Sequence, residues 1–310
     1  MEAFVTIVPI FAIIVLGWVA RRRGFITGEF LQPANRLVYY LALPALIFNS
    51  IARTDFHKQF DATVLLLTLA AALTVYVLAE LLARAARMTP ARVGAYVQCC
   101  GHGNLGYIGL PIALYYLGQE GLAKAGILCG FLMILQNFLS VVSLQLHKGG
   151  GAARLDGKAL LVKLLGNPVI LGAMSGIAVS AFSLPLPRVV GRSLDILGGL
   201  APPTALLLIG ASLSLELFRT YRFAALAAVA CKLLLLPGLG LGLFLLLDLK
   251  AEDYLPAIIL LASPTATVAY VMAREMGADA DFTVAAISAS TLGSALTAMF
   301  WLSLVAHISG

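Results

Sequence analysis

The chain has 310 residues, of which 61% are hydrophobic and only 12% are charged, and its formal net charge is +6. Soluble domains carry about 25% charged residues, so this composition excludes a soluble globular domain. The basic residues are spread over many short loops, which favours membrane topology over nucleic-acid binding as the reason for the positive charge.

Apolar runs of about 20 residues, the length that crosses the hydrocarbon of a bilayer, predict an all-α integral membrane protein with ten spans. The first run is expected to be retained as a span, because its arginines follow the apolar residues and no small-residue cleavage site is present. In chain order, the predicted spans are 3–20, 31–52, 62–83, 92–117, 122–146, 160–182, 190–215, 223–247, 254–275 and 282–306.

The loop charges predict the orientation of the spans. One alternating set of loops holds about twice as many Lys and Arg residues as the other set. The positive-inside rule therefore places the central loop in the cytoplasm and both termini outside, in a multi-pass protein of the cell membrane.

The two halves of the chain show related segments at one offset of about 159 residues. LALPAL at 41–46 corresponds to LAPPTAL at 200–206, and similar glycine-terminated helices follow in both halves. Since five spans per half give the halves opposite orientations, we expect two inverted five-helix repeats at 1–147 and 159–310. A cytoplasmic linker at 148–158 would join them.

Two predicted spans are interrupted at corresponding positions. GHGN includes Gly103 and Asn104, and the same offset carries Asn104 to the residue before Pro264 and Thr265 in SPT. Unwound backbone at membrane depth is tolerated only where protein or a wet cavity covers it, and paired breaks of inverted repeats often form a substrate site. We expect the half-helix N-termini to direct unpaired N–H groups at a carboxylate. The alternative is that the glycines permit close helix packing and Pro264 only kinks its helix.

Four further polar residues inside apolar spans are candidates for substrate binding. Gln136 and Asn137 in the fifth span carry amides that can donate to a carboxylate without the desolvation penalty of an ionisable group. Asn49 and Ser50, near the outer end of the second span, are candidates for lining the cavity. Hydrogen bonding between helices is the alternative reading for all four.

Two ionisable residues are candidates for coupling or electrostatic roles. His102 could couple protons, or it could be a neutral hydrogen-bonding partner. Lys232 lies deep in the eighth span, where an ammonium group must pair, snorkel or lose its proton. It could attract an anion or pair with Glu80. The four cysteines lie in apolar blocks without zinc spacing, so no metal or cofactor is expected.

Five segments follow one another in chain order and together resemble the auxin efflux carrier family, which includes the plant PIN-FORMED carriers and bacterial malonate and malate carriers. They are ANRLVYYLALPALIFNSIA (34–52), GNLGYIGLPIALYYLG (103–118), GNPVILGAMSGI (166–177), GGLAPPTALLLIGASLSL (198–215) and SPTATVAYVMAREMG (263–277).

The resemblance implies the fold of bile acid and sodium/proton transporters, with a scaffold domain, a transport domain whose fourth and ninth spans cross, an elevator-like motion and a possible homodimer. It also implies that Asn104 and Pro264 contact the substrate and that Gln136 matches a family glutamine. The chain differs from the plant carriers at Gly103, where they have proline, and at Val169, where they have asparagine. These differences argue against auxin itself as the substrate.

The expected function is therefore secondary transport of a small organic anion, such as an auxin-like aromatic carboxylate or a dicarboxylate, across the lipid bilayer. No Walker motif or phosphate-binding loop is present to use ATP. A sodium-coupled symporter of the bile-acid type and a ligand-binding membrane sensor of the same fold are the alternatives. An intramembrane enzyme is disfavoured, because every aspartate is assigned to a loop or to the flank of a span and no catalytic dyad is evident.

Overall fold

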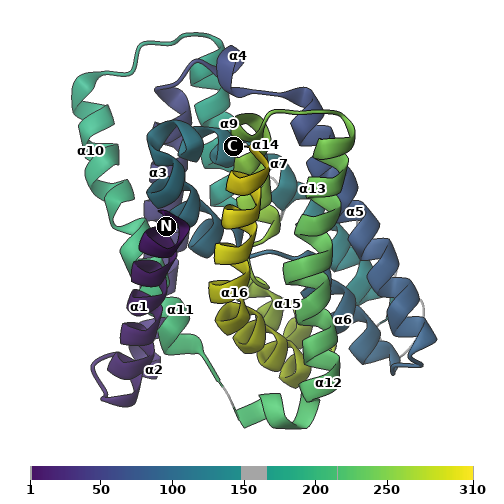
Figure 1. The fold of residues 1–310 in the computed structure, drawn as a ribbon. Helices are drawn as coiled ribbons and strands as arrows, with labels where there is room; N and C mark the ends of the chain where they lie inside the picture. Colours follow the sequence, from purple (N-terminus) through teal and green to yellow (C-terminus); the bar gives the residue numbers. More distant parts are fainter. Residues whose placement is uncertain (1, 148–165, 215, 310) are drawn as a thin grey trace. The chain divides into compact units, whose positions relative to one another are not determined.

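A computed structural model describes residues 2–147, 166–214 and 216–309 of the chain (Figure 1). Within these residues every regular element is a helix, apart from one isolated bridge between two loop residues. The predicted linker at 148–158 lies outside the described residues. The chain is an all-helical membrane protein, as the composition predicts.

The helices include three five-residue π-helical segments, which are labelled η. The bounds are α1 (Glu2–Arg22), α2 (Gly28–Leu37), η1 (Val38–Ala42), α3 (Leu43–Ala52), α4 (Phe56–Gln59), α5 (Ala62–Ala85), α6 (Pro90–Gly101), η2 (Leu105–Gly109), α7 (Leu110–Leu146), α9 (Pro168–Ala181), α10 (Arg188–Gly199), α11 (Ala201–Ser212), α12 (Glu216–Ala230), η3 (Cys231–Leu235), α13 (Leu236–Leu246), α14 (Ala251–Leu261), α15 (Val268–Glu275) and α16 (Ala280–Ser309).

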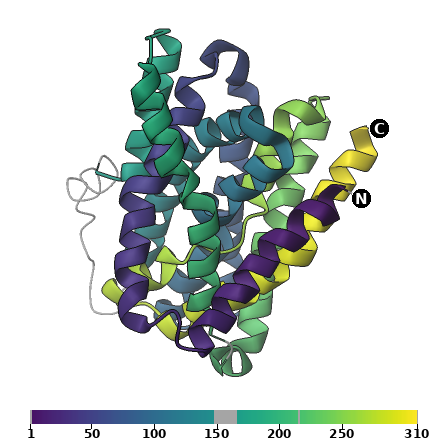
Figure 2. The same ribbon diagram turned by 90° about the vertical axis from the view of Figure 1, so that its left-hand side faces the viewer.

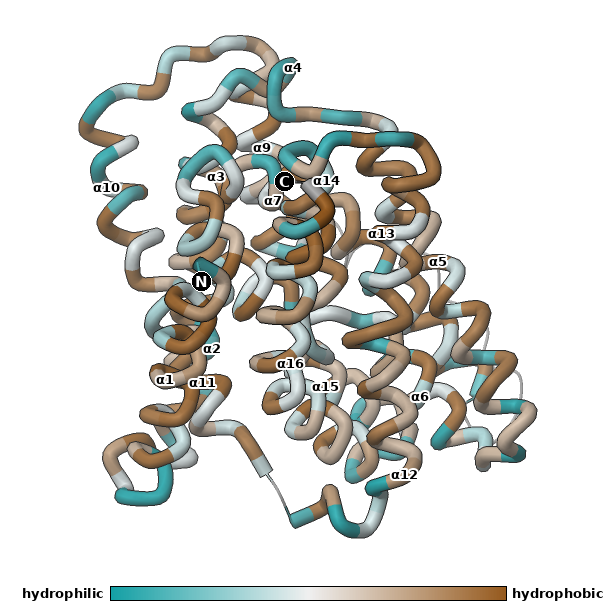
Figure 3. Tube along the Cα trace, viewed as in Figure 1, coloured by the Kyte–Doolittle hydropathy of each residue, from teal (hydrophilic) through white to brown (hydrophobic). Residues whose placement is uncertain are grey.

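Six helical stretches of the described chain are long and apolar enough to cross a membrane. They are Glu2–Arg22, Ala62–Ala85, Leu105–Leu146, Arg188–Ser212, Glu216–Leu246 and Ala280–Ile308. Figure 3 shows hydrophobic residues along α5 and α13 and hydrophilic residues at helix ends such as the start of α12. The other predicted spans consist of shorter elements: α2, η1 and α3 for the second, α9 for the described part of the sixth, and α14 and α15 for the ninth.

The long stretch α7 is two helices joined at Gly118. This residue has φ +71° and ψ −161°, which interrupts the helical backbone. Glycine reaches a positive φ without the steric penalty of a side chain, so the chain can turn here between two helices. The division lies between the predicted spans 92–117 and 122–146, so the glycine-terminated helix expected there is confirmed.

The contacts divide the chain into two compact units, each built from both halves of the sequence. Unit 1 comprises the described parts of Met1–Ala62, Leu105–Met133 and Leu165–Leu213. Unit 2 comprises the described parts of Thr63–Asn104, Ile134–Leu164 and Ser214–Gly310.

In unit 1, glycines let α9 and α10 approach the backbone of α3. A methyl group at Gly172 of α9 would lie 2.9 Å from the carbonyl oxygen of Pro44, and one at Gly198 of α10 would lie 2.8 Å from the Cα atom of Leu46. Both distances are too short for a real side chain. Small residues that permit such backbone contact are typical of helix packing in membranes, where burial from lipid gives no hydrophobic driving force.

The same kind of contact joins α1 to α11 in unit 1 (Figure 1). Gly17 of α1 lies against the carbonyl oxygen of Leu207, and Gly210 of α11 lies against the carbonyl oxygen of Ile14. An added methyl group at either glycine would overlap the facing backbone. Figure 2 shows α1 along its length as one straight helix, despite a proline at its third turn.

Unit 2 is built around α16, which packs against α6, α12, α14 and α15. Four hydroxyl-bearing residues of α16 in the SASTLGS run are buried. They are Ser288, Ser290, Thr291 and Ser294. A buried polar stripe on a membrane-length helix indicates that this face contacts polar groups of the protein and not lipid.

Each π-helical segment ends two residues before a proline. Pro44 follows η1, Pro111 follows η2 and Pro237 follows η3. Proline has no N–H for the usual i−4 bond, and its ring clashes with that carbonyl group. The helix widens in response, so that the residue before the proline donates to the carbonyl five residues back, as Leu43 and Leu236 do. Pro44 and Pro237 therefore shape their helices.

Candidate functional site

The two interrupted spans meet in unit 2 through a pair of backbone hydrogen bonds. The N–H of Asn104 donates to the carbonyl oxygen of Pro264 over 2.7 Å, and the N–H of Ala266 donates to the carbonyl oxygen of His102 over 2.9 Å. The two segments thus run antiparallel over this contact. The prediction that these two segments come together is confirmed by these bonds.

Side chains from the last helix of each half hold the two residues between these bonds. The N–H of Gly103 donates to Oε1 of Gln136 on α7 over 3.2 Å, and the N–H of Thr265 donates to Oγ of Ser290 on α16 over 3.1 Å. The Thr265 hydroxyl donates in turn to the carbonyl oxygen of Cys99 over 2.9 Å. Each break is therefore fixed by a polar side chain from its own half of the chain.

These contacts correct one expectation from the sequence. The half-helix N-termini were expected to offer unpaired N–H groups to a substrate, but at residues 103, 104, 265 and 266 each N–H group has a protein acceptor. The physical reason is that an unpaired backbone group at membrane depth is costly, so the two unwound segments satisfy each other. At these four residues, donors for a ligand must come from side chains.

Two buried amide groups supply such donors. Asn104 is 6% exposed and Gln136 is fully buried. Among the described residues, neither Nδ2 of Asn104 nor Nε2 of Gln136 has a hydrogen-bond partner. The bond from Gly103 fixes the orientation of the Gln136 amide, since its oxygen must face the N–H. An unsatisfied buried donor costs about 1–3 kcal/mol, so each NH₂ group is suited to an incoming acceptor.

His102 takes part in a buried chain of hydrogen bonds. Its Nδ1 lies 3.1 Å from Oγ of Ser140, which lies 2.8 Å from the hydroxyl of Tyr76, and this hydroxyl is 3.2 Å from the carbonyl oxygen of Gln136. The carbonyl oxygen can only accept, so Tyr76 donates to it, Ser140 donates to Tyr76, and Nδ1 of His102 donates to Ser140. His102 is thus a donor at Nδ1, and this hydrogen bond helps to hold the interrupted segment GHGN in place.

Lys232 is fully buried in η3, and its Nζ donates to the carbonyl oxygen of Leu261 over 2.7 Å. The alternative that it pairs with Glu80 is wrong. Glu80 instead forms an ion pair with Arg84 at 2.6 Å, and its carboxylate lies 3.1 Å from Nε2 of His147. Both partners lie close to Glu80 near the helix ends, where a carboxylate is more easily hydrated than at the depth of Lys232.

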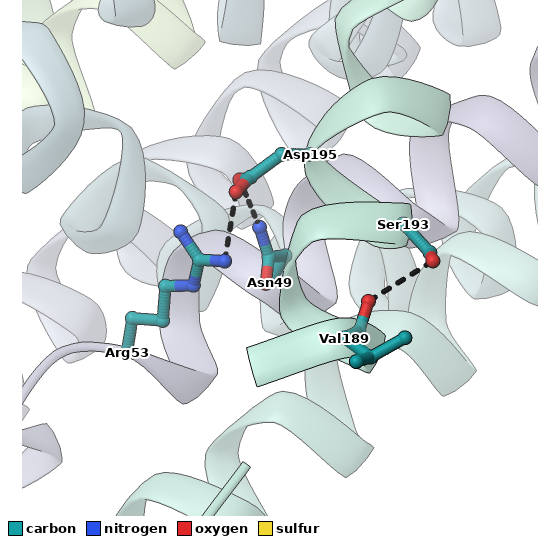
Figure 4. Close-up of polar contacts among 5 residues, drawn as sticks. All are labelled: Asn49, Arg53, Val189, Ser193 and Asp195. Carbon is teal, nitrogen blue, oxygen red and sulfur yellow. Dashed lines mark hydrogen bonds and ion pairs between the residues drawn. The ribbon is translucent and has the colours of Figure 1, made fainter. Parts of the chain in front are cut away.

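Asn49 and Ser50 belong to unit 1, whereas the paired breaks belong to unit 2. Nδ2 of Asn49 donates to Oδ1 of Asp195 on α10, and Arg53 binds the other carboxylate oxygen at 2.8 Å (Figure 4). The amide nitrogen of Asn49 is therefore engaged by a carboxylate. Ser50 is buried beside it, and its hydroxyl has no partner among the described residues.

Asp195 and Ser290 are polar partners that sequence reasoning missed. The assignment of every aspartate to a loop or span flank is wrong for Asp195, which lies within α10 and inside the predicted span 190–215. The sequence signal for Asp195 was a single carboxylate within a mainly apolar stretch. For Ser290, the signal was the polar run SASTLGS inside the last span. Asn137, next to Gln136 on α7, is half-buried and has an interaction partner of its own.

Comparison with known proteins gives consistent matches over nearly the whole chain. The model of a family described as "Membrane transport protein" matches residues 2–155 and again residues 151–302. An uncharacterized transporter from Methanothermobacter thermautotrophicus is 23% identical over 297 residues, which cover 96% of each chain. A protein of Rhizobium meliloti named "Putative malonate transporter" is 28% identical over 298 residues, which cover 94% of this chain and 92% of the relative. An uncharacterized transporter from Methanocaldococcus jannaschii is 25% identical over 296 residues, covering 93% and 94%.

Proposed function

The chain belongs to the membrane transport protein family of the auxin efflux carriers, and from this premise we propose that it is a secondary carrier of small organic anions. It is a multi-pass membrane transporter and not an enzyme. The proposal concerns the class of substrate, the residues that bind it and the way in which it crosses the bilayer.

The observation that carries the proposal is the pair of buried amide donors beside the paired breaks. Asn104 and Gln136 each present an NH₂ group with no acceptor among the described residues. Carboxylate oxygens are strong acceptors, and an amide binds them without bringing a charge that must itself be desolvated. Gly103, Pro264 and Thr265 form the frame of the proposed site. The carbonyl oxygen of Pro264 accepts the N–H of Asn104 across the two segments, and the N–H groups of Gly103 and Thr265 are held by Gln136 and Ser290.

Malonate and other short dicarboxylates are the proposed first substrates, ahead of aromatic carboxylates. The support is the name of the Rhizobium meliloti relative, which is 28% identical to this chain. A dicarboxylate also has several acceptor oxygens within reach of two neighbouring amide donors. Asn49 and Ser50 are given no direct contact in this proposal, because the amide nitrogen of Asn49 already donates to Asp195.

The proposed architecture is ten spans in two inverted repeats, 1–147 and 159–310, with both termini outside the cell. The double match of the family model supports a repeat, and so does the antiparallel pairing of the two breaks. The equivalent roles of Gln136 and Ser290, each on the last helix of its half, support it further. We assign unit 2, which contains both breaks, as the transport domain of an elevator and unit 1 as its scaffold.

Proteoliposome flux tests the proposal. A thermal-shift screen of the purified protein against dicarboxylates and aromatic carboxylates identifies the ligand, because binding stabilises the fold by mass action. Radiolabelled malonate, or the best hit, is then offered to proteoliposomes, and saturable uptake above that of protein-free vesicles is expected. Binding without flux would indicate a membrane sensor, and neither binding nor flux with any anion would refute the proposal.

A further inference from the structure

Lys232 is a buried amine without a carboxylate partner among the described residues. Its side chain is fully buried, and among the described residues no carboxylate forms an ion pair with it. Burial of an ammonium group at membrane depth without a counter-charge costs free energy, and charged residues that are retained there mark functional sites. The position therefore requires a partner for the charge.

The surroundings of Lys232 compensate the charge only in part. The Leu261 carbonyl oxygen that accepts from Nζ belongs to the last residue of α14, where the helix dipole presents about half an elementary negative charge. Among the described residues this carbonyl is the one acceptor that Nζ has, while an ammonium group carries three N–H bonds. The remaining donors are free to meet an anion.

Lys232 also lies next to the paired breaks. Leu261 precedes Pro264 by three residues at the end of α14, and η3, which carries Lys232, packs against α6, whose last residue directly precedes His102. An anion held by the amide of Asn104, two residues after His102, would therefore lie in the field of this ammonium group.

At this place a bound sodium ion would have to share carbonyl oxygens that already accept hydrogen bonds. Hard cations take several converging oxygen ligands, commonly with a carboxylate. The carbonyl oxygens of His102 and Pro264 accept backbone N–H groups, that of Cys99 accepts the Thr265 hydroxyl, and that of Leu261 accepts Lys232. The described residues contain no cluster of three or more His, Cys, Asp or Glu side chains that could hold a metal.

We propose that Lys232 is a resident cation of the binding site, which supplies the positive charge that a coupled sodium ion would otherwise bring. The inference rests on the proposed function, since it concerns how that same site neutralises its organic anion. The carrier binds its substrate without sodium, and it discriminates an anion from a neutral molecule of the same shape through Lys232.

The test compares two ligands, two salts and four forms of the full-length protein. Binding of malonate and of malonamide, its neutral analogue, is measured for the wild type in sodium chloride and in choline chloride of equal strength. The same titrations are made for Lys232→Met, with Lys232→Gln as a second neutral variant should the first fold poorly. Lys250→Met is the matched control, because Lys250 is exposed at the opposite end of α14.

The expected result for the wild type is a malonate affinity that is the same within about twofold in the two salts. Lys232→Met is expected to weaken malonate binding at least tenfold and malonamide binding less than threefold, while Lys250→Met changes neither. Sodium-dependent binding by the wild type, or an unchanged ratio of the two affinities in both Lys232 variants, overturns the inference and leaves anion transport intact. Failure of the wild type to bind any organic anion refutes the proposed function as well.

Discussion

The backbone N–H of Asn104 donates to the carbonyl oxygen of Pro264 over 2.7 Å, and this bond joins the interrupted span of one half of the chain to that of the other. The bond fixes the main chain from which the Asn104 amide projects. Since the reciprocal bond from Ala266 to His102 closes the pair, the side chain is presented from a rigid frame even though it follows unwound backbone.

Gln136→Glu is expected to abolish malonate binding while it preserves the fold. Glutamate keeps an oxygen that can accept the N–H of Gly103, but it replaces the unpartnered NH₂ group by a negative charge that repels a carboxylate. We expect a loss of affinity of at least tenfold by calorimetry. Gln145→Glu, further along the same helix, is the control and should bind normally. Normal binding by Gln136→Glu would remove this residue from the site.

Asn104→Ala is expected to abolish proteoliposome uptake of the same ligand without loss of protein from the membrane. The substitution removes the second amide donor, but the backbone N–H that bonds Pro264 stays in place. Unchanged flux in correctly inserted protein would show that Asn104 does not bind the substrate.

Gly101→Ala is expected to lower the melting temperature in detergent. The ring of Tyr76 lies against this glycine, and an added methyl group would overlap it. Tyr76 cannot move freely, because its hydroxyl is held in the chain of hydrogen bonds to Ser140. Overpacking of this kind destabilises by about 1–3 kcal/mol. Gly242→Ala, where nothing lies within 4 Å of the added carbon, is the control and should melt as the wild type does.

Asp195→Ala is expected to destabilise the protein more than Arg53→Ala does, although the two residues form one ion pair. Their side chains are 48% and 46% exposed, so the pair itself contributes less than about 1 kcal/mol. Loss of Asp195 additionally leaves the buried amide nitrogen of Asn49 without its acceptor, which costs about 1–3 kcal/mol. Thermal unfolding of the two variants compares them directly, and equal losses would contradict this explanation.

Trp301→Phe is expected to destabilise unit 2 by removing the donor to an orphaned carbonyl group. The indole N–H of Trp301 donates to the carbonyl oxygen of Leu233 over 2.8 Å. In a regular helix this carbonyl group would accept the N–H of residue 237, but Pro237 has no N–H. The loss should be about 1–3 kcal/mol. In a Pro237→Ala background the new N–H can replace the indole, so the same substitution should cost less there. Equal costs in both backgrounds would disprove the link between Pro237 and Trp301.

Much of this arrangement could be predicted from the sequence, because local chemistry decides it. Gly103 and Pro264 mark the two breaks, since glycine and proline weaken a helix wherever they stand. Apolar length likewise decides where the spans lie. The partner of each unwound N–H group could not be predicted, because Gln136 and Ser290 reach the breaks only through the packing of α7 and α16.

The polar contacts between helices were the least predictable part. The sequence offered two partners for Lys232, an anion or Glu80, but its Nζ donates to a main-chain oxygen. Every residue has a main-chain oxygen, so the sequence gives no sign of which one acts as acceptor. Asp195 was overlooked for a related reason. Its partners Asn49 and Arg53 lie more than a hundred residues earlier, and only the packing of α10 on α3 brings them together.

The three π-helical segments have a consequence for comparing this chain with its relatives. An i→i+5 turn contains one residue more than an α-turn, and one residue rotates a helix face by about 100°. Pro44, Pro111 and Pro237 each follow such a surplus residue. A relative that lacks one of these prolines is therefore expected to be one residue shorter just before that position. The side chains beyond it would then point in the same directions as in this chain.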